Sequence, residues 1–393
     1  MWKDCTMIKK IKETDWWEVS YLLIYAIIFS KEFLQTTMFP IQWPLGLGYV
    51  FALMSGGYVI AKFLFHNTYT KKEMILAILV LIAFCVPAFT TDYTYLFWTG
   101  CLIVGAKDVD FNKILKVYLV LGITFMVAAF AASQGGLIED LQYVTHRGEE
   151  LVTRHSFGII YPTDFAAHLF YLVIAWVVYV RNRFNVFHKA GVVLIIACIV
   201  WVFSNAQTST VSLIGVALLC MLERILEKHI QIIEKILRFI PVVLAAISLY
   251  LSSIYHINIE WIRKINNFIS GRLEIGRKAF DEYDLKLFGQ SIIEIGSGMT
   301  TDATNEYFFL DNSFVAIAFK YGIVALVVII MLWMYISKKA VVEKYYIIST
   351  TIVIIMIHSL MEHHLIEIAY NPMMFVAFAS FRGMDTIIGG KNV

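Results

Sequence analysis

Residues 311–336 read D-N-S-F-V-A-I-A-F-K-Y-G-I-V-A-L-V-V-I-I-M-L-W-M-Y-I, and after Asp311 the stretch contains one charged residue, Lys320. A helix of about 20 apolar residues crosses the hydrocarbon core of a bilayer, so this stretch predicts a transmembrane helix. Comparable apolar runs fill most of the chain: 17–35, 44–65, 73–90, 92–107, 112–132, 162–180, 189–205, 207–222, 236–255, 345–361 and 364–381. We therefore expect an all-α integral membrane protein of about twelve transmembrane helices, with residues 1–393 forming a single polytopic domain.

The composition supports the same fold class. Hydrophobic residues make up 59% of the 393-residue chain, charged residues make up 16%, and the mean hydropathy is +0.72. Soluble domains contain about 25% charged residues, so this chain has too few charges to cover a surface that faces water. The net charge of +2 is too small to indicate a nucleic-acid partner. The five cysteines share no spacing typical of a metal or redox site.

The positions of the basic residues predict the orientation. When the N-terminus is placed in the cytoplasm, most of the 32 lysines and arginines fall in segments that then face the cytoplasm. This distribution follows the positive-inside rule along the whole chain. It places both termini in the cytoplasm and leaves two long loops on the outer face, at about 133–161 and 256–310. The motif Asp108-Val109-Asp110 falls in a cytoplasmic loop, where we expect it to be solvated.

Basic residues in the two outer loops run against that rule. Lys31 and Lys320 lie near helix ends, where long side chains reach the interface. The remaining outer basic residues are Arg147, Arg154, Arg263, Lys264, Arg272, Arg277, Lys278 and Lys286. A guanidinium group binds phosphate oxygens in a bidentate manner that lysine cannot match, so the arginines predict a lipid-linked pyrophosphate at the outer leaflet as the partner. The alternative is ordinary solvated surface charge, which is the better interpretation for the lysines.

The first outer loop ends in R-H-S-F-G-I-I-Y-P-T-D-F-A-A-H, residues 154–168. Gly158 follows Arg154 four residues later, and a glycine allows the backbone to approach a ligand closely. The proline of this stretch opens the next predicted helix, at a position where proline is tolerated. His155 is a candidate for a phosphate contact, and Tyr161 is a candidate for stacking on a sugar ring.

The second outer loop contains S-G-R-L-E-I-G-R-K-A-F-D-E-Y-D-L-K-L-F-G-Q, residues 270–290. Apolar or small residues recur in it at helical spacing, at Leu273, Gly276, Phe280, Tyr283 and Leu287. This spacing predicts an amphipathic helix. Such a helix would lie along the outer surface and present Arg272 and Arg277 to lipid headgroups.

After this loop comes L-D-N-S-F-V-A-I-A-F-K-Y-G-I, residues 310–323. Together the three stretches resemble the superfamily of O-antigen ligases and Wzy polymerases of bacterial cell-surface polysaccharide assembly. Its members show R-x-x-x-G followed by P-N in the first outer loop, G-R in the large loop, and H-N or D-N before a late helix. The matching residues here are Arg154, Gly158, Arg272, Asn312 and Gly322. Arg147, separated from Gly158 by ten residues, is also similar to loops of Wzy polymerases.

Three positions depart from that pattern. Thr163 stands where many members have asparagine after the proline. In F-S-N-A-Q-T-S-T, residues 203–210, Gln207 is nearest to the place of an arginine that is common at this helix junction. Asp311 occupies the place where ligases carry histidine, which favours a polymerase over a ligase.

The resemblance implies a GT-C-like glycosyltransferase in the bacterial cytoplasmic membrane, with its active site facing outward. It would build a capsule, an exopolysaccharide or an O-antigen by transferring a growing glycan from undecaprenyl pyrophosphate to the terminal hydroxyl of a lipid-linked repeat unit. The transfer would invert the anomeric centre and use neither a metal ion nor a cofactor. A flippase and a chain-length regulator are the expected partner proteins.

In this mechanism Arg154 and Arg272 would stabilise the pyrophosphate leaving group, and Asp311 would be the general base. The expected substrate contacts are Arg147, Arg277, His155, Tyr161, Asn312 and His364. The alternative interpretation of Asp311 is that it caps the N-terminus of the helix that follows.

Glu362, His363 and His364 lie at the outer end of the predicted helix 345–361. Adjacent histidines point in different directions on a helix, so we do not expect them to bind one metal ion together. One of them is a candidate base or a contact to the acceptor sugar.

Two other functions fit the same sequence. One is an O-antigen-type ligase, and the other is a transporter, such as a flippase for lipid-linked oligosaccharides. A transporter typically has charged residues near the midpoints of its helices and broken helices in repeated halves. The sequence shows no repeat, and its charges concentrate at one face.

Overall fold

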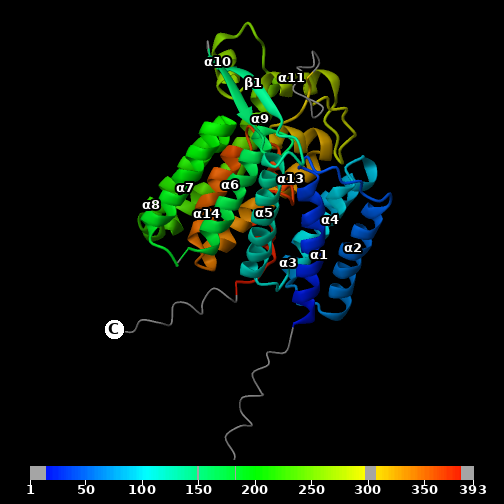
Figure 1. Ribbon diagram of the computed structural model, residues 1–393. Helices are drawn as coiled ribbons and strands as arrows, with labels where there is room; N and C mark the ends of the chain where they lie inside the picture. The colour runs from blue at the N-terminus through cyan, green and yellow to red at the C-terminus, as the bar shows by residue number, and fades with distance from the viewer. Residues whose placement is uncertain (1–14, 148–149, 182, 297–306, 382–393) are drawn as a thin grey trace, which may run out of the picture.

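The computed structural model describes residues 15–147, 150–181, 183–296 and 307–381. Within these residues, six helices are long and apolar enough to cross a membrane: α2 (Leu47–Phe65), α3 (Lys71–Thr90), α5 (Phe111–Gln134), α6 (Pro162–Tyr179), α7 (Val186–Ile199) continued by the π-helical turn η2 (Val200–Ser204), and α13 (Ile323–Val342). They run side by side between two ends of the molecule (Figure 1). The protein is therefore helical and embedded in a membrane.

Further helices of the described chain complete the bundle: α1 (Trp16–Leu34), α4 (Tyr95–Gly105), α8 (Gln207–Leu237), α9 (Ile240–Ser253) and α14 (Tyr346–His358). Each lies where an apolar run predicts a helix, but most of them differ in length from the prediction: α4, α9 and α14 are shorter and α8 is longer. α4 has only 11 residues, whereas α8 has 31 and extends well beyond the apolar run at 207–222. The second half of α8 carries charges such as Glu227 and Lys228, so hydropathy alone ends the helix too early.

The flanks of the bundle are apolar. Leu53 of α2, Ile75 of α3 and Ile195 of α7 are 76%, 61% and 63% exposed. A large exposed apolar surface on a folded protein needs a partner other than water, and the lipid of a bilayer provides it. This is the physical reason why the chain needs so few charges.

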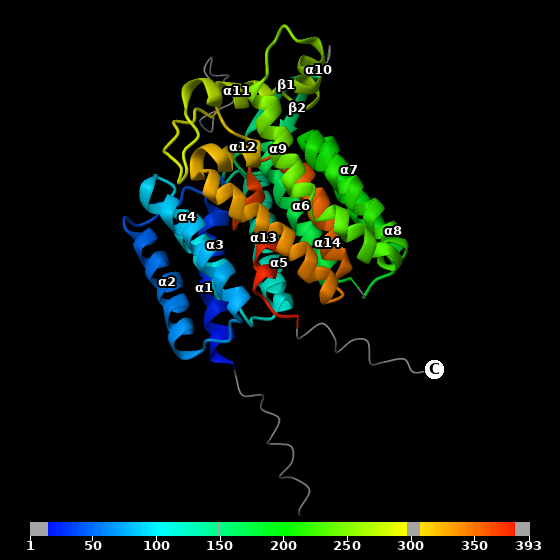
Figure 2. The ribbon, with the colours of Figure 1, turned by 180° about the vertical axis from the view of Figure 1, so that it is seen from behind.

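The two ends of the bundle differ. Four elements gather at one end, which we call the loop end (Figure 1): β1 (Gln142–Arg147), β2 (Glu150–His155), α10 (Glu260–Phe268) and α11 (Arg272–Glu282). α1 begins at the opposite end, which we call the terminal end (Figure 2). The sequence predicts the long loops but not the antiparallel hairpin β1–β2, in which Tyr143 pairs with Arg154.

The predicted amphipathic helix of the second loop is shorter than expected. It forms as α11 but ends before Tyr283, and it follows α10, which the pattern does not predict. Its apolar face packs on protein. A Cβ at Gly276 would lie 2.4 Å from Oγ of Ser252 in α9, and Phe280 meets Phe319 edge-on at 4.8 Å between ring centroids. The helix therefore lies against the bundle, and of the two arginines expected to face lipid headgroups, Arg272 is 17% exposed and Arg277 is 40% exposed.

The stretch 311–336 does not form one helix. It is divided at Gly322, with α13 after the break and two short elements before it: α12 (Ser313–Ala316) and η3 (Ile317–Tyr321). The preceding loop fills the break, because Lys286 and Leu287 accept hydrogen bonds from the first two backbone N–H groups of α13, over 3.0 and 3.1 Å. Gly322 has a φ of 96°, and a Cβ there would lie 2.4 Å from the carbonyl oxygen of Leu287. Only glycine fits this position.

The predicted helix at 364–381 is wrong. The segment contains two short 3-10 helices joined by a hydrogen-bonded turn at 368–370: η4 (His364–Ile366) and η5 (Pro372–Ala377). It leads from the loop end to the terminal end (Figure 2), where the backbone N–H of Ser380 donates to the loop before α5 over 2.7 Å. Its side chains are almost all buried. A non-helical backbone is tolerated at membrane depth only where protein encloses it, and Pro372 cannot donate the hydrogen bond that a helix interior requires.

Candidate functional site

A cavity of about 660 Å³ lies at the loop end. Its wall combines residues of both long loops with residues at helix ends, and it includes Arg154, Tyr161, Arg272 and Asp311. These are four predicted site residues from distant parts of the sequence. We call this space the arginine cavity.

The position of Arg272 is set by the chain around it. Gly271 has a left-handed backbone with a φ of 84°, which turns the chain into α11. The side-chain oxygen of Asn266, in α10, accepts the backbone N–H groups of the two residues after Arg272, over 3.0 and 3.1 Å. This satisfies donors that the first turn of a helix otherwise leaves unpaired. Nε of Arg272 donates to the carbonyl oxygen of Met361 over 3.2 Å.

Arg272 forms an ion pair with Asp311. Nη1 of Arg272 lies 2.9 Å from Oδ2 of Asp311, and only 17% and 11% of the two side chains are exposed. Burial raises the pKa of the Asp311 carboxyl, and the positive charge of Arg272 opposes this rise. The hydroxyl of Tyr307 also donates to Oδ2 of Asp311, over 3.4 Å. The pair therefore places a guanidinium group beside a carboxylate at a site largely shielded from water.

Asp311 does not cap the helix that follows it. The side-chain oxygen of Asn312 accepts the backbone N–H groups of Phe314 and Val315 over 3.0 and 3.2 Å, and Nδ2 of Asn312 donates to Oγ of Ser248. The N-cap interpretation therefore belongs to Asn312. Asn312 is buried and is not among the described residues of the cavity wall, so the structure does not support the expected substrate contact.

Arg154 reaches the arginine cavity from β2. Its Nε donates to the backbone oxygen of Ser204 over 2.8 Å, and Oγ of Ser204 donates to the backbone oxygen of His155 over 3.1 Å. These hydrogen bonds connect the β1–β2 hairpin to η2, which lies between α7 and α8 in the sequence. Gly158 was expected to let the backbone approach a ligand. Its backbone instead lies close to α5, because a Cβ at Gly158 would lie 2.6 Å from the carbonyl oxygen of Ala129.

Among the described residues, the wall of the arginine cavity includes neither Arg277 nor His155. Nη2 of Arg277 lies 2.5 Å from Oδ1 of Asp281, one turn later in α11, and 40% of the arginine side chain is exposed. Nδ1 of His155 lies 2.8 Å from Oδ2 of Asp140. Nη1 of Arg277 also donates to the backbone oxygen of Ser253 at the end of α9, so contacts within the protein occupy both side chains. Arg147 has its backbone in β1, but its side chain lies outside the described part of the structure.

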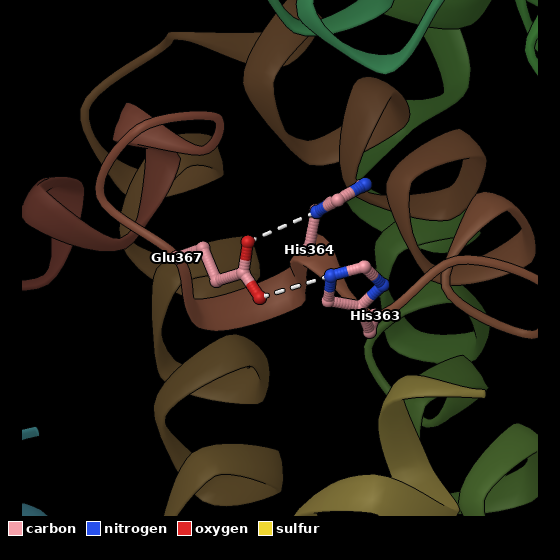
Figure 3. A group of neighbouring side chains, drawn as sticks. All are labelled: His363, His364 and Glu367. Carbon is pink, nitrogen blue, oxygen red and sulfur yellow. Dashed lines mark hydrogen bonds and ion pairs between the residues drawn. The ribbon is translucent and has the colours of Figure 1, made fainter. Parts of the chain in front are cut away.

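Three residues that follow α14 form a cluster (Figure 3). α14 ends at His358, so His363 and His364 lie beyond the helix, and the expectation that they diverge is wrong. Nε2 of His363 lies 3.4 Å from Oε1 of Glu367, and Nδ1 of His364 lies 3.0 Å from Oε2. His363 lines the arginine cavity. His364 is fully buried and stacks on Tyr370 at 3.7 Å between ring centroids, so it is not placed for the expected substrate contact.

Sequence reasoning missed several carboxylates of this site. Oδ1 of Asp164, in the first turn of α6, lies 3.7 Å from Nε2 of His364. Glu294 lines the arginine cavity and forms an ion pair with Lys320 at 2.7 Å. For Asp164 the sequence did contain a signal: it is an acidic residue at the start of an apolar helix, and ionisable residues inside membrane segments mark functional sites.

A second cavity, of about 320 Å³, adjoins the first. Its wall includes three tyrosines and three carboxylates: Tyr93, Tyr95, Tyr370, Glu32, Glu294 and Glu367. We call it the tyrosine cavity. Of the described residues, Glu294, Phe309 and His363 line both cavities. No motif predicts this space, because its residues come from segments that are far apart in the sequence.

The fold and these cavities define a class, a helical membrane protein with a charged and largely buried cavity at one end. Comparisons with protein-family models, curated proteins and solved structures find no match to this chain. The side chains themselves indicate what the cavities can do. Guanidinium groups hold anions through charge-assisted hydrogen bonds, a carboxylate can accept a proton, and aromatic faces pack against other apolar faces.

Proposed function

We propose that this protein is a glycosyltransferase of the bacterial cytoplasmic membrane that polymerises a surface polysaccharide. It transfers a growing glycan from undecaprenyl pyrophosphate to a lipid-linked repeat unit. The observation that carries the proposal is the ion pair between Arg272 and Asp311 in a cavity that also contains Arg154. Two guanidinium groups and one carboxylate are the groups that this reaction needs.

Twelve crossings would account for the path of the chain. The helices α1 to α9, α13 and α14 lead alternately between the two ends, and the irregular segment 364–381 makes one more crossing. Basic side chains belong to segments at the terminal end, such as Lys62, Lys107, Lys113 and Lys339. By the positive-inside rule, the terminal end then faces the cytoplasm and the loop end faces outward.

The arginines act on the leaving group. During transfer, a hydroxyl oxygen of the acceptor bonds to the anomeric carbon while the bond from that carbon to the pyrophosphate oxygen breaks. The pyrophosphate leaves with the electron pair, and its developing negative charge is stabilised by fixed cations. Arg154 and Arg272 supply these cations on the wall of one cavity.

Asp311 accepts the proton of the attacking hydroxyl. Its ion pair with Arg272 favours the charged carboxylate despite burial, and only the charged form can accept a proton. Attack from the side opposite the pyrophosphate inverts the anomeric centre. The neighbouring tyrosine cavity fits the glycan, because aromatic faces pack on sugar rings and carboxylates such as Glu32 accept hydrogen bonds from hydroxyl groups.

Deletion of the gene tests this function in cells. We expect the deletion strain to carry a single repeat unit on the lipid carrier. The wild-type gene should restore long chains, whereas Arg272→Ala, with a rate about tenfold to a hundredfold lower, should leave most of the carrier with a single unit. Arg277→Ala is the matched control and should restore them, because Arg277 pairs with Asp281 in the same helix and is not among the described residues of the cavity wall. Long chains in the deletion strain would disprove the proposed function.

Transport of a lipid-linked glycan is the second candidate function. The helix broken at Gly322 favours it, since transporters bind substrates at discontinuous helices. Purified protein in detergent separates the two functions. A polymerase lengthens the glycan and releases undecaprenyl pyrophosphate without a sealed membrane, whereas a transporter acts only between two compartments.

A further inference from the structure

We propose that His363, His364 and Glu367 bind one divalent transition-metal ion at the wall between the two cavities. Nε2 of His363 and Nδ1 of His364 face the carboxylate of Glu367 at 3.4 and 3.0 Å (Figure 3). One ligand atom from each residue lies within 4.8 Å of the other two. Two ligands of one tetrahedral zinc ion lie roughly 3.3 Å apart, so a small inward movement of the rings completes the set.

Each histidine has a further carboxylate behind it. Nδ1 of His363 lies 3.9 Å from Oδ1 of Asp311, and Nε2 of His364 lies 3.7 Å from Oδ1 of Asp164. Within the described part of the chain, these two buried ring nitrogens have no hydrogen-bond partner. A carboxylate that receives the far N–H group of a ligating histidine fixes its tautomer and makes it a stronger ligand. The two carboxylates stand on the side of each ring away from Glu367, at distances longer than a hydrogen bond, which is the side on which such a carboxylate supports a ligating histidine.

The charge of the surrounding walls also fits a cation. Counting only described residues, five carboxylates line the two cavities: Glu32, Asp164, Glu294, Asp311 and Glu367. The same walls contain three basic residues: Arg154, Arg272 and Lys320. One divalent ion would balance the excess of negative charge. It would also make the cavities more favourable for an anionic ligand.

The donor set indicates the kind of ion. Two imidazoles and one carboxylate suit Mn²⁺, Fe²⁺, Co²⁺ or Zn²⁺, whereas Mg²⁺ prefers oxygen ligands. Three protein ligands leave coordination positions open. Because His363 and Glu367 line the tyrosine cavity, a hydroxyl or phosphate oxygen in that cavity could reach the ion. If His364 is instead protonated and the three residues only form ion pairs, the protein binds no metal ion here.

Zinc binding to the purified full-length protein tests the proposal. The protein should carry a purification tag without histidine, be stripped of metal with a chelator, and then be titrated with Zn²⁺ in a calorimeter. We expect one ion per chain. Loss of a carboxylate behind a ligating histidine typically weakens binding tenfold to a hundredfold, so Asp164→Asn should fall in that range. His363→Gln and Glu367→Gln remove a ligand and should weaken binding by about a hundredfold or more.

His155→Gln is the matched control, because His155 also faces a carboxylate, that of Asp140, but has no part in the cluster. It should bind Zn²⁺ as the wild type does. Undiminished binding in both His363→Gln and Glu367→Gln would place the ion elsewhere and overturn the proposal, as would the absence of binding to the wild type.

An EPR spectrum of the wild-type protein with Cu²⁺ needs no variant and covers the case in which a variant fails to fold. We expect hyperfine coupling to two nitrogens, and coupling to one or none would contradict the proposal. Neither measurement uses a glycan. A negative result therefore leaves the proposed glycosyl transfer standing, and the failure of that function leaves the metal site standing.

Discussion

Nη1 of Arg272 lies 2.9 Å from Oδ2 of Asp311, although one residue begins α11 and the other precedes α12. Asn312 caps α12, so the Asp311 carboxylate is available to face the arginine. Nε of the same guanidinium donates to the backbone oxygen of Met361, beyond α14. One arginine thus joins the second long loop to two other parts of the bundle at the edge of the cavity.

Arg272→Ala should lower the rate of glycan transfer by about tenfold to a hundredfold, because a hydrogen bond to a charged group contributes about 1.5–3 kcal/mol. Arg272→Lys should restore only part of the rate, since lysine lacks the bidentate geometry. The measurement is the release of undecaprenyl pyrophosphate from lipid-linked repeat units by the purified protein. Arg277→Ala, in the same helix, should keep the wild-type rate. Full activity of Arg272→Ala would show that its charge plays no part in the reaction.

Asp311→Asn should stop chain extension, because loss of a general base lowers a rate by about a hundredfold to ten-thousandfold. The protein should still fold, since Asn312 keeps the helix cap and an asparagine can still accept a hydrogen bond from Arg272. Gel analysis of glycan length gives the result. If Asp311→Asn still makes long chains, the base lies elsewhere. His363 is then the next candidate, because it lines the same cavity, and His364 and Glu362 lie beside it in the sequence.

Asn312→Ala should have the opposite effect. Removing a helix cap costs about 0.5–2 kcal/mol of stability, so the melting temperature should fall while glycan transfer per folded molecule stays near the wild-type rate. Thermal unfolding in detergent and the transfer assay together check this expectation. A loss of transfer in fully folded Asn312→Ala would assign this residue to the substrate after all.

Gly322→Ala should destabilise the protein strongly. Its φ of 96° is unfavourable for alanine, and the new Cβ would meet the backbone of Leu287 at 2.4 Å. A backbone conformation of this kind costs about 1–3 kcal/mol even without the clash. Gly191→Ala is the control, because a Cβ at this helical position meets no atom of the described structure within 4 Å. Equal melting temperatures for the two variants would contradict the role of Gly322 in the helix break.

The proposed orientation is tested by labelling single cysteines in intact cells. Lys264→Cys, in α10 at the loop end, should react with a membrane-impermeant maleimide, and Lys228→Cys, in α8, should react only after the cells are opened. Both positions are exposed. The native cysteines are replaced first, so that each protein carries one thiol. Labelling of Lys228→Cys from outside would reverse the orientation and put the arginine cavity in the cytoplasm.

Hydropathy predicted most of the helices, but it cannot tell lipid from protein as the surroundings of an apolar segment. Residues 364–381 are as apolar as a transmembrane helix, yet they are buried among helices and form η4 and η5 instead. The local signal was Pro372 after Asn371, whose side chain accepts the backbone N–H of Met373 and so starts η5. At 311–336 the signal was Gly322, and its meaning depends on a loop that packs against it from elsewhere in the chain.

The residues of the site were likewise predictable only in part. Motifs singled out Arg154, Arg272 and Asp311, and the structure brings all three to one cavity. Their arrangement depends on the β1–β2 hairpin and on the capping of α11 by α10, which follow from tertiary contacts that no local pattern contains. Glu367 was missed because one carboxylate in an apolar run has no periodic signature. His363 was misjudged because helical geometry was applied to the two histidines at the outer end of the predicted helix 345–361, whereas α14 ends at residue 358.

Segment 364–381 also constrains how the protein is assembled in its membrane. A helix satisfies its own backbone hydrogen bonds and can enter lipid alone, but this segment depends on side chains of other elements. Nζ of Lys339 donates to the carbonyl oxygens of Ala377 and Ala379, and the hydroxyl of Tyr118 donates to the backbone carbonyl oxygen of Tyr370. Lipid offers no such partners. The neighbouring helices must therefore be inserted in the bilayer before this segment can take its place between them.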